Sequence, residues 1–206
     1  MQNDRQSHWN AVYSSKAETD VSWFQQTPAP SLESLARVQA RRGDAIIDIG
    51  GGESRLVDSL LADGFKSLTV LDLSATALAH ARARLGDRGD RVTWIAADAT
   101  TWQPPQSYDV WHDRAAFHFL TAESDQQAYL DRLKQSLNPR GHVIFGTFAP
   151  DGPEKCSGLP VVRHDSDSLA RLLGTSFALI DWRRHDHVTP WGAVQKFQFS
   201  TFRSNT

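Results

Sequence analysis

The stretch Ala45-Ile46-Ile47-Asp48-Ile49-Gly50-Gly51-Gly52-Glu53-Ser54 decides the fold. Its apolar first half predicts a short buried strand, and its glycines predict a tight turn that a ligand can approach closely. The segment 54–62 that follows carries its leucines and valine on one face, which predicts a helix. The free N–H groups at the start of such a helix carry partial positive charge, so this unit predicts a ligand site, although a bare turn gives the same pattern.

The rest of the chain continues the alternation of strands and helices. Apolar runs predict strands over 68–71, 92–95, 108–111 and 142–148, and helical spacing predicts helices over 31–39, 74–86, 124–137 and 166–173. Two last strands, 177–182 and 194–202, follow without a clear helix between them. The pattern predicts an α/β fold, a mostly parallel Rossmann-like sheet with helices on both faces and an antiparallel excursion at one edge.

Composition excludes several classes of protein. The chain has 206 residues, the size of one domain, and 22 Lys and Arg stand against 24 Asp and Glu. This balance argues against a nucleic-acid partner, and no apolar run is long enough for a membrane span. The first ten residues contain no apolar stretch typical of a signal peptide. A single cysteine fits a reducing compartment, so we expect a cytoplasmic protein.

Acidic residues follow the first three predicted strands. Asp72 stands 20 residues after Gly52, where a carboxylate binds a ribose diol in nucleotide-binding sheets. Asp98 stands beside Ala99, where it is able to accept from an adenine amino group while the small neighbour lets the ring pack closely. Taken alone, each of these acids is equally typical of a helix cap or of a solvated loop residue. Together with Asp48 they mark one edge of the sheet, because parallel strands end on the same side.

From Ala45 to Phe148 the sequence resembles the class I S-adenosylmethionine-dependent methyltransferases. That family has a seven-stranded sheet with the last strand inserted antiparallel. The resemblance implies S-adenosyl-L-methionine as cofactor, S-adenosyl-L-homocysteine as product and no metal. Ser54 departs from the last glycine of the family's loop, and Arg140 departs from its Pro-Gly-Gly turn before strand five. The cofactor-binding residues implied are Asp48, Gly50, Gly51, Gly52, Ser54, Asp72, Leu73, Asp98 and Ala99, with Ala99 acting through its backbone.

Candidate catalytic residues follow the fourth predicted strand, in His112-Asp113-Arg114-Ala115-Ala116-Phe117-His118. Methyl transfer needs an aligned acceptor, exclusion of water and, for some acceptors, loss of a proton. We expect Asp113 to shape the cofactor side, and Arg114 with His112 or His118 to hold or deprotonate the acceptor. The alternative is structural: Asp113 and Arg114 pair, and the histidines satisfy backbone groups.

The run Asp113-Arg114-Ala115-Ala116 resembles the Asp-Arg-Gly-Ala run of thiopurine S-methyltransferases and, less closely, the Asp-Lys-Gly-Thr run of protein-lysine methyltransferases. An arginine beside a thiol lowers its pKa and favours the thiolate. The resemblance implies a methyltransferase acting on a small-molecule acceptor, a thiol or a sulfide. A protein-lysine N-methyltransferase and a non-catalytic cofactor-binding module are the alternatives. Arg55 disfavours a nicotinamide dehydrogenase, because that fingerprint needs a glycine there.

Residues 1–30 form an aromatic leader that ends in the Pro-rich connector 27–30, and residues 31–206 form the single methyltransferase domain. We expect the leader to fold over the cofactor and Trp23 to touch it; its rings otherwise only plug the end of the sheet. No length remains for a separate substrate domain, which favours a small acceptor and a monomer or homodimer. Of seven tryptophans, Trp94 and Trp182 are expected in the core, and Trp9, Trp23, Trp111 and Trp191 around the pocket.

Two features carry weaker functional interpretations. The loop 149–160 is turn-rich and is expected to cover the substrate; its Cys156 is more typical of a small buried apolar residue than of a nucleophile. His185 and His187 share one strand face, but no third metal ligand is evident, so a solvated strand end is expected.

Overall fold

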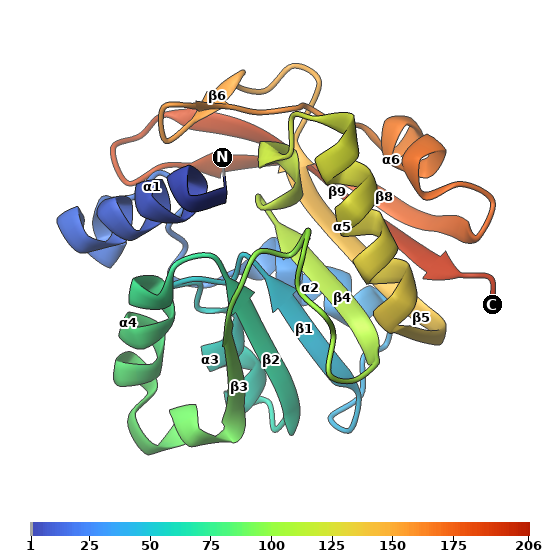
Figure 1. The fold of residues 1–206 in the computed structure, drawn as a ribbon, viewed down its shortest axis with the longest axis horizontal. Coiled ribbons are helices and arrows are strands. Elements are labelled where there is room, and N and C mark those ends of the chain that lie inside the picture. The colour runs from blue at the N-terminus through green and yellow to red at the C-terminus, as the bar shows by residue number, and fades with distance from the viewer. Residues whose placement is uncertain (1) are drawn as a thin grey trace.

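The computed structural model describes residues 2–206, and within that range one sheet of seven strands runs through the centre of the molecule (Figure 1). The strands lie in the order β3-β2-β1-β4-β5-β9-β8, and β9 is antiparallel to both of its neighbours. The mostly parallel, Rossmann-like sheet with an antiparallel last strand is thereby confirmed. The strands are β1 (Ala45–Ile49), β2 (Ser67–Asp72), β3 (Val92–Ala96), β4 (Tyr108–Arg114), β5 (Leu137–Phe148), β8 (Phe177–Val188) and β9 (Val194–Ser204).

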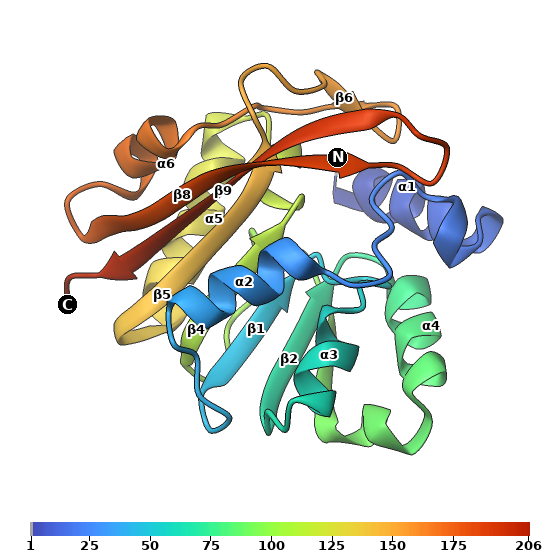
Figure 2. The ribbon, with the colours of Figure 1, turned by 180° about the vertical axis from the view of Figure 1, so that it is seen from behind.

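Helices cover both faces of the sheet (Figures 1 and 2). The helices α2 (Ala29–Arg37), α3 (Leu56–Ala62) and α4 (Ala75–Leu85) share one apolar cluster with the sheet, and α5 (Glu123–Ser136) and α6 (Ser166–Leu173) share the other. Leu60 and Leu133 are representative, with 3% and 0% of their surface exposed. Each such side chain stabilises the fold by roughly 1.5–3 kcal/mol relative to an exposed one.

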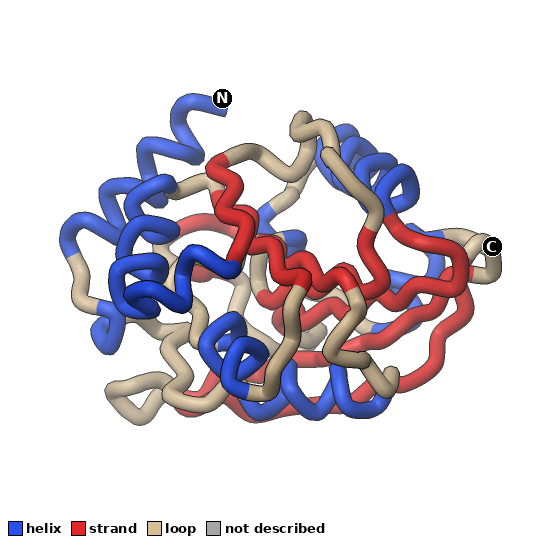
Figure 3. Tube along the Cα trace, turned by 90° about the horizontal axis from the view of Figure 1, so that it is seen from below, coloured by secondary structure: helices blue, strands red, loops and turns tan. Residues whose placement is uncertain are grey.

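Short elements and the leader complete the edge at which β1 to β4 end. The leader forms α1 (Gln2–Ser15) and the 3-10 turn η1 (Glu18–Asp20), and α1 lies across this edge (Figures 1 and 2). The remaining pieces are η2 (Gly86–Arg91), η3 (Phe117–Phe119) and the hairpin β6 (Lys155–Cys156) and β7 (Leu159–Pro160). Figure 3 shows the two chain ends well apart on the surface, the first at α1 and the second beyond β9.

Strand β4 is longer than expected. The sequence predicted a strand over 108–111 with a loop after it, but His112, Asp113 and Arg114 continue the strand and pair with β5, His112 and Asp113 also with β1. A central strand supplies hydrogen-bonding partners on both sides, and this outweighs the polar character of these residues. The segment around Arg140, which resembles the family's turn before strand five, is likewise part of β5, with Arg140 at a φ of 60°.

The tryptophans divide differently from the expectation. Trp182 was expected in the core but has 53% of its surface exposed, because β8 is an edge strand with one face toward solvent. Trp111 was expected near the pocket but is fully buried, since β4 lies between β1 and β5. Trp191, in the β8–β9 turn, is 61% exposed and does not line the cavity described below.

The described residues include neither a membrane-spanning helix nor a cluster of metal ligands. None of the helices within 2–206 combines the length and hydropathy that a membrane crossing demands. In the same range, no three His, Cys, Asp or Glu side chains gather closely enough to hold a metal ion.

Candidate active site

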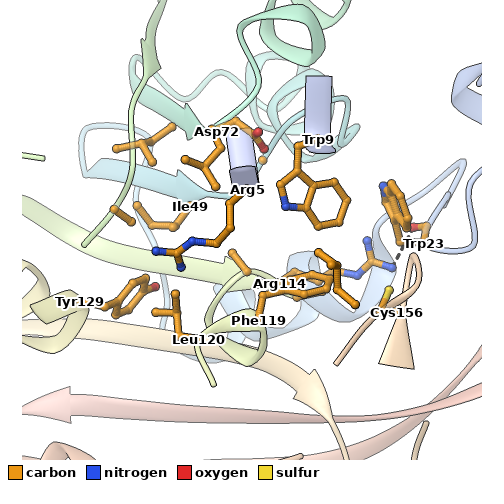
Figure 4. Close-up of a pocket in the computed structure, with 18 of the residues that line it drawn as sticks. Arg5, Trp9, Trp23, Ile49, Asp72, Arg114, Phe119, Leu120, Tyr129 and Cys156 are labelled. Atoms are coloured by element: carbon orange, nitrogen blue, oxygen red, sulfur yellow. Dashed lines mark hydrogen bonds between the residues drawn. The ribbon is translucent and has the colours of Figure 1, made fainter. Parts of the chain in front are cut away.

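A cavity of about 290 Å³ opens where β1, β2, β3 and β4 end, beneath α1 (Figure 4). This is the edge at which the strand order reverses between β1 and β4, where open α/β sheets bind ligands. The structure brings ten of the residues predicted from sequence to its wall: Trp23, Asp48, Gly50, Gly51, Ser54, Asp72, Leu73, Asp98, Ala99 and Arg114. Gly52, His112, Asp113 and His118 are not part of that wall.

The glycine turn forms the floor of the cavity because side chains do not fit there. Gly50 has a φ of 65°, and a Cβ on it would lie 2.5 Å from the Cβ of Ala116. A Cβ on Gly51 would lie 2.7 Å from the Oδ2 atom of Asp48. The turn is held by the Gly50 N–H, which donates to the Leu71 carbonyl at 2.7 Å. Bare backbone is therefore presented next to the Asp48 carboxylate.

A chain of hydrogen bonds fixes Asp48 from behind. Its Oδ1 lies 2.7 Å from Nδ1 of His112, and Nε2 of His112 lies 2.9 Å from the Ser31 hydroxyl. All three side chains are buried, so neither histidine nitrogen is directed at the cavity. His112 therefore holds Asp48 from behind and does not line the cavity.

Asp72, at the end of β2, is buried and accepts from the Ser74 N–H at 2.7 Å. Burial raises its pKa to about 7, with the charges of Asp48 and Glu53 contributing. The helix cap expected at Ser74 is present, because its hydroxyl accepts from the Ala77 N–H. Ser74, and not Asp72, therefore caps the helix α4. The Oδ2 atom of Asp72 lies close to Gly52, and the side chain lines the cavity.

Asp98 marks the third strand end. Its Oδ1 accepts from the N–H and the hydroxyl of Thr100, at 2.9 and 2.7 Å. Its Oδ2 lies 3.5 Å from a guanidinium nitrogen of Arg5, which also approaches Asp125 at 3.3 Å. Arg5 therefore reaches from α1 into the cavity and bridges two acids that belong to different elements (Figure 4).

Arg114 lies at the other end of the cavity, beside Trp23 and Cys156 (Figure 4). Its Nη2 donates to the Trp23 carbonyl at 3.0 Å, and its guanidinium lies 5.5 Å from the centre of the Phe197 ring. Burial lowers its pKa to about 10, so it stays charged at neutral pH. Burial raises the pKa of the Cys156 thiol to about 11, which fits the expected buried, unreactive cysteine.

Asp113 and His118 face away from the cavity. Asp113 is fully buried and accepts from the backbone N–H groups of Ala116 and Phe117 at 3.0 Å each, and from the Tyr129 hydroxyl at 2.6 Å. Burial raises its pKa to about 6. His118 is also fully buried, 4.8 Å from the Phe148 ring, and burial lowers its pKa to about 3. Both geometries match the structural alternative for these residues, except that Asp113 does not pair with Arg114.

Several lining residues were missed by sequence reasoning, among them Arg5, Gln195 and Phe197. Arg5 stands four residues before Trp9 and eight before Tyr13, which is the spacing of one helix face and the signal that would have identified it. No local pattern marks Gln195 and Phe197. Phe197 pairs with Phe148 of β5 at the cavity, and Gln195 stands two residues earlier on the same strand and pairs with His187 of β8.

Polar contacts fasten the leader to the domain. From α1, the Gln6 amide donates to the Leu73 carbonyl at 3.2 Å, and the Asn10 amide oxygen lies 2.7 Å from the Ser74 hydroxyl. Farther along, Glu18 pairs with Arg55 at 2.7 Å and with Arg84 at 3.2 Å. The leader therefore contacts the loop after β2 and the helix that follows the glycine turn.

Comparison with protein families gives a match to the methyltransferase domain over residues 46–141. The trans-aconitate 2-methyltransferase of Methylobacterium radiotolerans is 34% identical over 124 residues, which cover 59% of this chain and 44% of that protein. The human N-terminal Xaa-Pro-Lys N-methyltransferase 1 is 30% identical over 127 residues, 57% of this chain and 56% of the other. The malonyl-[acyl-carrier protein] O-methyltransferase of Anoxybacillus flavithermus is 33% identical over 50% of this chain and 38% of its own. The chain thus spans about half, or less, of the curated relatives it matches.

Solved structures share the fold over nearly the whole chain. The 1,6-didemethyltoxoflavin-N1-methyltransferase of Burkholderia thailandensis superimposes with a TM-score of 0.70 at 21% identity, over 100% of this chain and 87% of that one. The N-methyltransferase NodS of Bradyrhizobium japonicum gives 0.72 at 15% identity, over 96% and 98%. Residues 46–141 match the methyltransferase domain, and the sheet order, the glycine turn and the acids at three strand ends are those expected of the class I S-adenosylmethionine-dependent methyltransferases.

Proposed function

We propose that the protein transfers a methyl group from S-adenosyl-L-methionine to a small-molecule acceptor, and that the acceptor atom is the sulfur of a thiol or sulfide. One observation carries the proposal. A single cavity joins the acidic strand ends at Asp48, Asp72 and Asp98 to an aromatic end that contains Arg114. The cavity therefore has room for a cofactor at one end and for a small acceptor at the other end.

The residues at the acidic end fit the cofactor. A side chain at Gly51 would collide with the Asp48 carboxylate, so this position must be a glycine. The bare backbone at Gly51 lets the methionyl group of the cofactor approach closely. Asp72 offers a buried carboxylate for a ribose diol, and Ala99 offers a small neighbour for adenine next to Asp98. We infer that these residues, with Gly50, Gly52, Ser54 and Leu73 of the same loops, hold the cofactor. When bound, it supplies an electrophilic methyl group on a sulfonium.

Arg114 is the residue that we place against the acceptor. Its guanidinium lines the cavity and remains charged, so it favours a thiolate over a thiol in the same place. The resemblance of the run 113–116 to that of thiopurine S-methyltransferases supports sulfur as the acceptor atom. The aromatic rings around Arg114 exclude water, which keeps the thiolate nucleophilic.

The other three candidate catalytic residues, Asp113, His112 and His118, do not touch the acceptor in this proposal. Asp113 holds the turn after β4, because both N–H groups that it binds belong to that turn. The Cβ of Ala116, in the same turn, would contact one on Gly50, so the turn packs directly on the glycine loop. His112 orients Asp48, and His118 fills the core behind Phe119. We therefore assign Asp113, His112 and His118 as positioning residues.

The leader, residues 1–30, is proposed as a cover for the cofactor. Trp9 packs edge-on against Trp23 at 5.7 Å and against Phe119 at 5.0 Å, so rings from the leader and the domain interlock above the cavity. Trp23 additionally accepts the hydrogen bond of Arg114 through its carbonyl. The cover thus touches both the cofactor end and the acceptor end.

The test is incubation of the purified protein with methyl-labelled cofactor and a panel of low-mass thiols and sulfides. Methylated low-mass products are expected, with formation of S-adenosylhomocysteine. Arg114→Ala should lower turnover far more than it lowers cofactor affinity, measured by calorimetry with S-adenosylhomocysteine. Absence of transfer to every thiol and sulfide, with transfer to an amine or carboxylate, would remove sulfur from the proposal and keep the methyltransferase.

A protein-lysine N-methyltransferase is the second candidate, because a relative that is 30% identical bears a protein N-methyltransferase name. Arg114 disfavours it, since a guanidinium in the acceptor end repels a lysine ammonium. Incubation with labelled cofactor and a cell lysate separates the two. Label in protein bands would favour lysine, and label in low-mass products favours the small acceptor.

A further inference from the structure

The strand β8 forms one edge of the sheet, and its outer backbone edge is unpaired within the described residues. It has 12 residues and pairs with β9 alone. From Ala178 to Val188 the backbone bonds to β9 and to no other described element. The β8–β9 hairpin runs across the molecule from near α6 to α1 (Figure 2). A long edge with unpaired N–H and C=O groups is a template for a strand of another chain.

The exposed apolar side chains of the protein gather on this hairpin. Among residues 4–206, the large apolar side chains that are exposed all belong to β8, to the turn after it or to the start of β9, and they are Leu179, Ile180, Trp182, Val188, Trp191 and Val194. Single exposed apolar residues are normal on a protein surface, but a group of them on one element marks a contact with another molecule. The hairpin is therefore a candidate interface.

The solvent face of β8 carries a pattern that is complementary to its own reverse. Alternate residues of a strand share a face. On this face stand four exposed residues, in the order apolar, basic, acidic, apolar: Trp182, Arg184, Asp186 and Val188. If a second copy of β8 pairs antiparallel about a two-fold axis at His185, Arg184 faces the partner's Asp186, and Trp182 faces the partner's Val188. A surface that matches its own reverse is the property of an isologous interface, in which one patch contacts itself.

Charge favours this register over its neighbours. A two-fold axis normal to the sheet keeps the same face of both copies on one side, so the axis passes through a residue. Moving it from His185 to Arg184 would place two guanidinium groups opposite each other, and moving it to Asp186 would do the same for two carboxylates. Like charges directly opposite destabilise a pair of strands, and opposite charges stabilise it. The axis at His185 is therefore the one that matches both charged residues.

The other face of β8 brings no unpaired charge into this contact. Arg183 pairs with Glu33 at 2.8 Å and donates to the Ser34 hydroxyl at 2.9 Å, so its guanidinium is directed at α2. His185, on the axis, faces the partner's His185. Burial lowers the pKa of His185 and of His187 below the usual value for histidine. These rings are therefore uncharged at neutral pH, and the two copies do not repel each other through them.

An open groove next to Val188 gives room for the larger side chain of the contact. Its volume is about 360 Å³, and it lies between Val188 and Pro190 of the hairpin and residues 24–27 of the leader. In the register about the axis described above, the partner's Trp182 is directly opposite Val188. The groove can take its indole ring, which removes apolar surface of both copies from water.

We propose that β8 is a self-association surface: two copies of the chain pair their β8 strands antiparallel about a two-fold axis at His185 and form a dimer with one continuous sheet. Arg184 and Asp186 fix the register, and Trp182 against the partner's Val188 supplies the buried apolar contact. None of these residues lines the cavity of the candidate active site, so the dimer and the proposed function are tested separately.

Sedimentation equilibrium of the purified protein measures the dissociation constant of the dimer. We expect Asp186→Arg to raise it at least about tenfold, because both charge pairs of the dimer become repulsive. Arg184→Asp should do the same. The double variant reverses both charges and restores the match, so its dissociation constant should return close to that of the wild type. Arg88→Asp, at an exposed arginine near the opposite edge of the sheet, is the matched control and should leave the constant unchanged.

The single variants also alter contacts within one copy, and the double variant separates these effects from the interface. Arg184 contacts Asp151, and Asp186 stands opposite Lys196 on β9. The contact between Arg184 and Asp151 is lost in the single and in the double variant alike. Recovery of the dimer in the double variant must therefore come from the contact between copies, and circular dichroism checks that each variant is folded.

Three results would overturn the inference. The first is a wild-type protein that stays monomeric at millimolar concentration. The second is a dimer whose dissociation constant is unchanged in both single variants, because the interface would then lie elsewhere. The third is a dimer that the double variant does not restore, because the two charges would then not face each other. A monomer that sediments with phosphatidylcholine vesicles would assign the apolar hairpin to a lipid surface instead.

Discussion

Replacing Tyr129 by phenylalanine probes the buried network behind the active site. The Tyr129 hydroxyl donates to Asp113 at 2.6 Å and accepts from the Trp111 indole N–H at 2.8 Å, and both partners are fully buried. Tyr129→Phe takes one hydrogen bond from a carboxylate and leaves an indole N–H without a partner. A bond to a charged group contributes about 1.5–3 kcal/mol, and an orphaned buried donor costs about 1–3 kcal/mol. We expect the free energy of unfolding to fall by about 3–5 kcal/mol.

Urea unfolding at pH 8, followed by fluorescence, measures this loss. The matched control is Tyr108→Phe, because Tyr108 is equally buried in the same cluster and its hydroxyl faces only the uncharged side chains of Thr69 and Gln106. The control should lose about 1 kcal/mol, as expected for a hydroxyl whose partners carry no charge. Loss of a donor raises the pKa of Asp113, which burial already raises to about 6. Asp113 is ionised at pH 8 and largely protonated at pH 5, so the loss should be larger at pH 8.

The reasoning would be refuted if the Tyr129 and Tyr108 variants unfolded at the same urea concentration. It would also be refuted if the loss were larger at pH 5 than at pH 8. Either outcome would mean that Tyr129 does not stabilise the ionised Asp113 carboxylate, and the positioning role assigned to Asp113 would fall with it.

Three other changes should have measurable effects. Gly50→Ala should weaken S-adenosylhomocysteine at least about tenfold in calorimetry, because a left-handed φ and a Cβ 2.5 Å from that of Ala116 displace the loop; undiminished affinity would contradict this. Burial lowers the pKa of His118 to about 3 and of His164 to about 4, so stability to urea should fall as the pH drops below about 6.5, the unfolded value, and His118→Phe should flatten that slope. Glu18→Gln should lower the free energy of unfolding by at most about 1 kcal/mol and speed proteolysis of the leader. Equal cleavage rates of the variant and the wild-type protein would show that the ion pairs of Glu18 do not hold the leader in place.

Most of the fold could be predicted from the chain because each strand–helix unit carries its own signal. The helix over 166–173 was predicted to the residue, since Gly174 ends it and its leucines share one face. The end of β4 was not predicted correctly, because the polar run His112-Asp113-Arg114 is typical of a loop when the neighbouring strands are unknown. The burial of Trp182 was predicted wrongly for the same reason, since the pattern along a strand does not reveal that β8 lies at the edge of the sheet.

The candidate site was predictable at the strand ends and not beyond them. Topology alone brings Asp72 and Asp98 to one cavity, so their positions follow once the sheet is recognised. Which way a side chain of β4 points depends on the strand's exact length, and the sequence pattern ended the strand three residues early. Arg114 therefore meets the cavity while Asp113, one residue earlier, faces the core. The roles of these residues stay predictions until the variants are measured.

The docking of α1 has a consequence for how the cavity exchanges its contents. The helix α1 has 14 residues and is not part of the sheet. Polar side chains such as Gln6 and Asn10 attach it by hydrogen bonds to Leu73 and Ser74, in the loop after β2. Local opening of such a unit requires less free energy than global unfolding. Amide hydrogens of α1 should therefore exchange with solvent faster than those of β1, and more slowly once a nucleoside is bound. We expect the rate of cofactor exchange to follow the undocking of this helix, while the sheet stays folded.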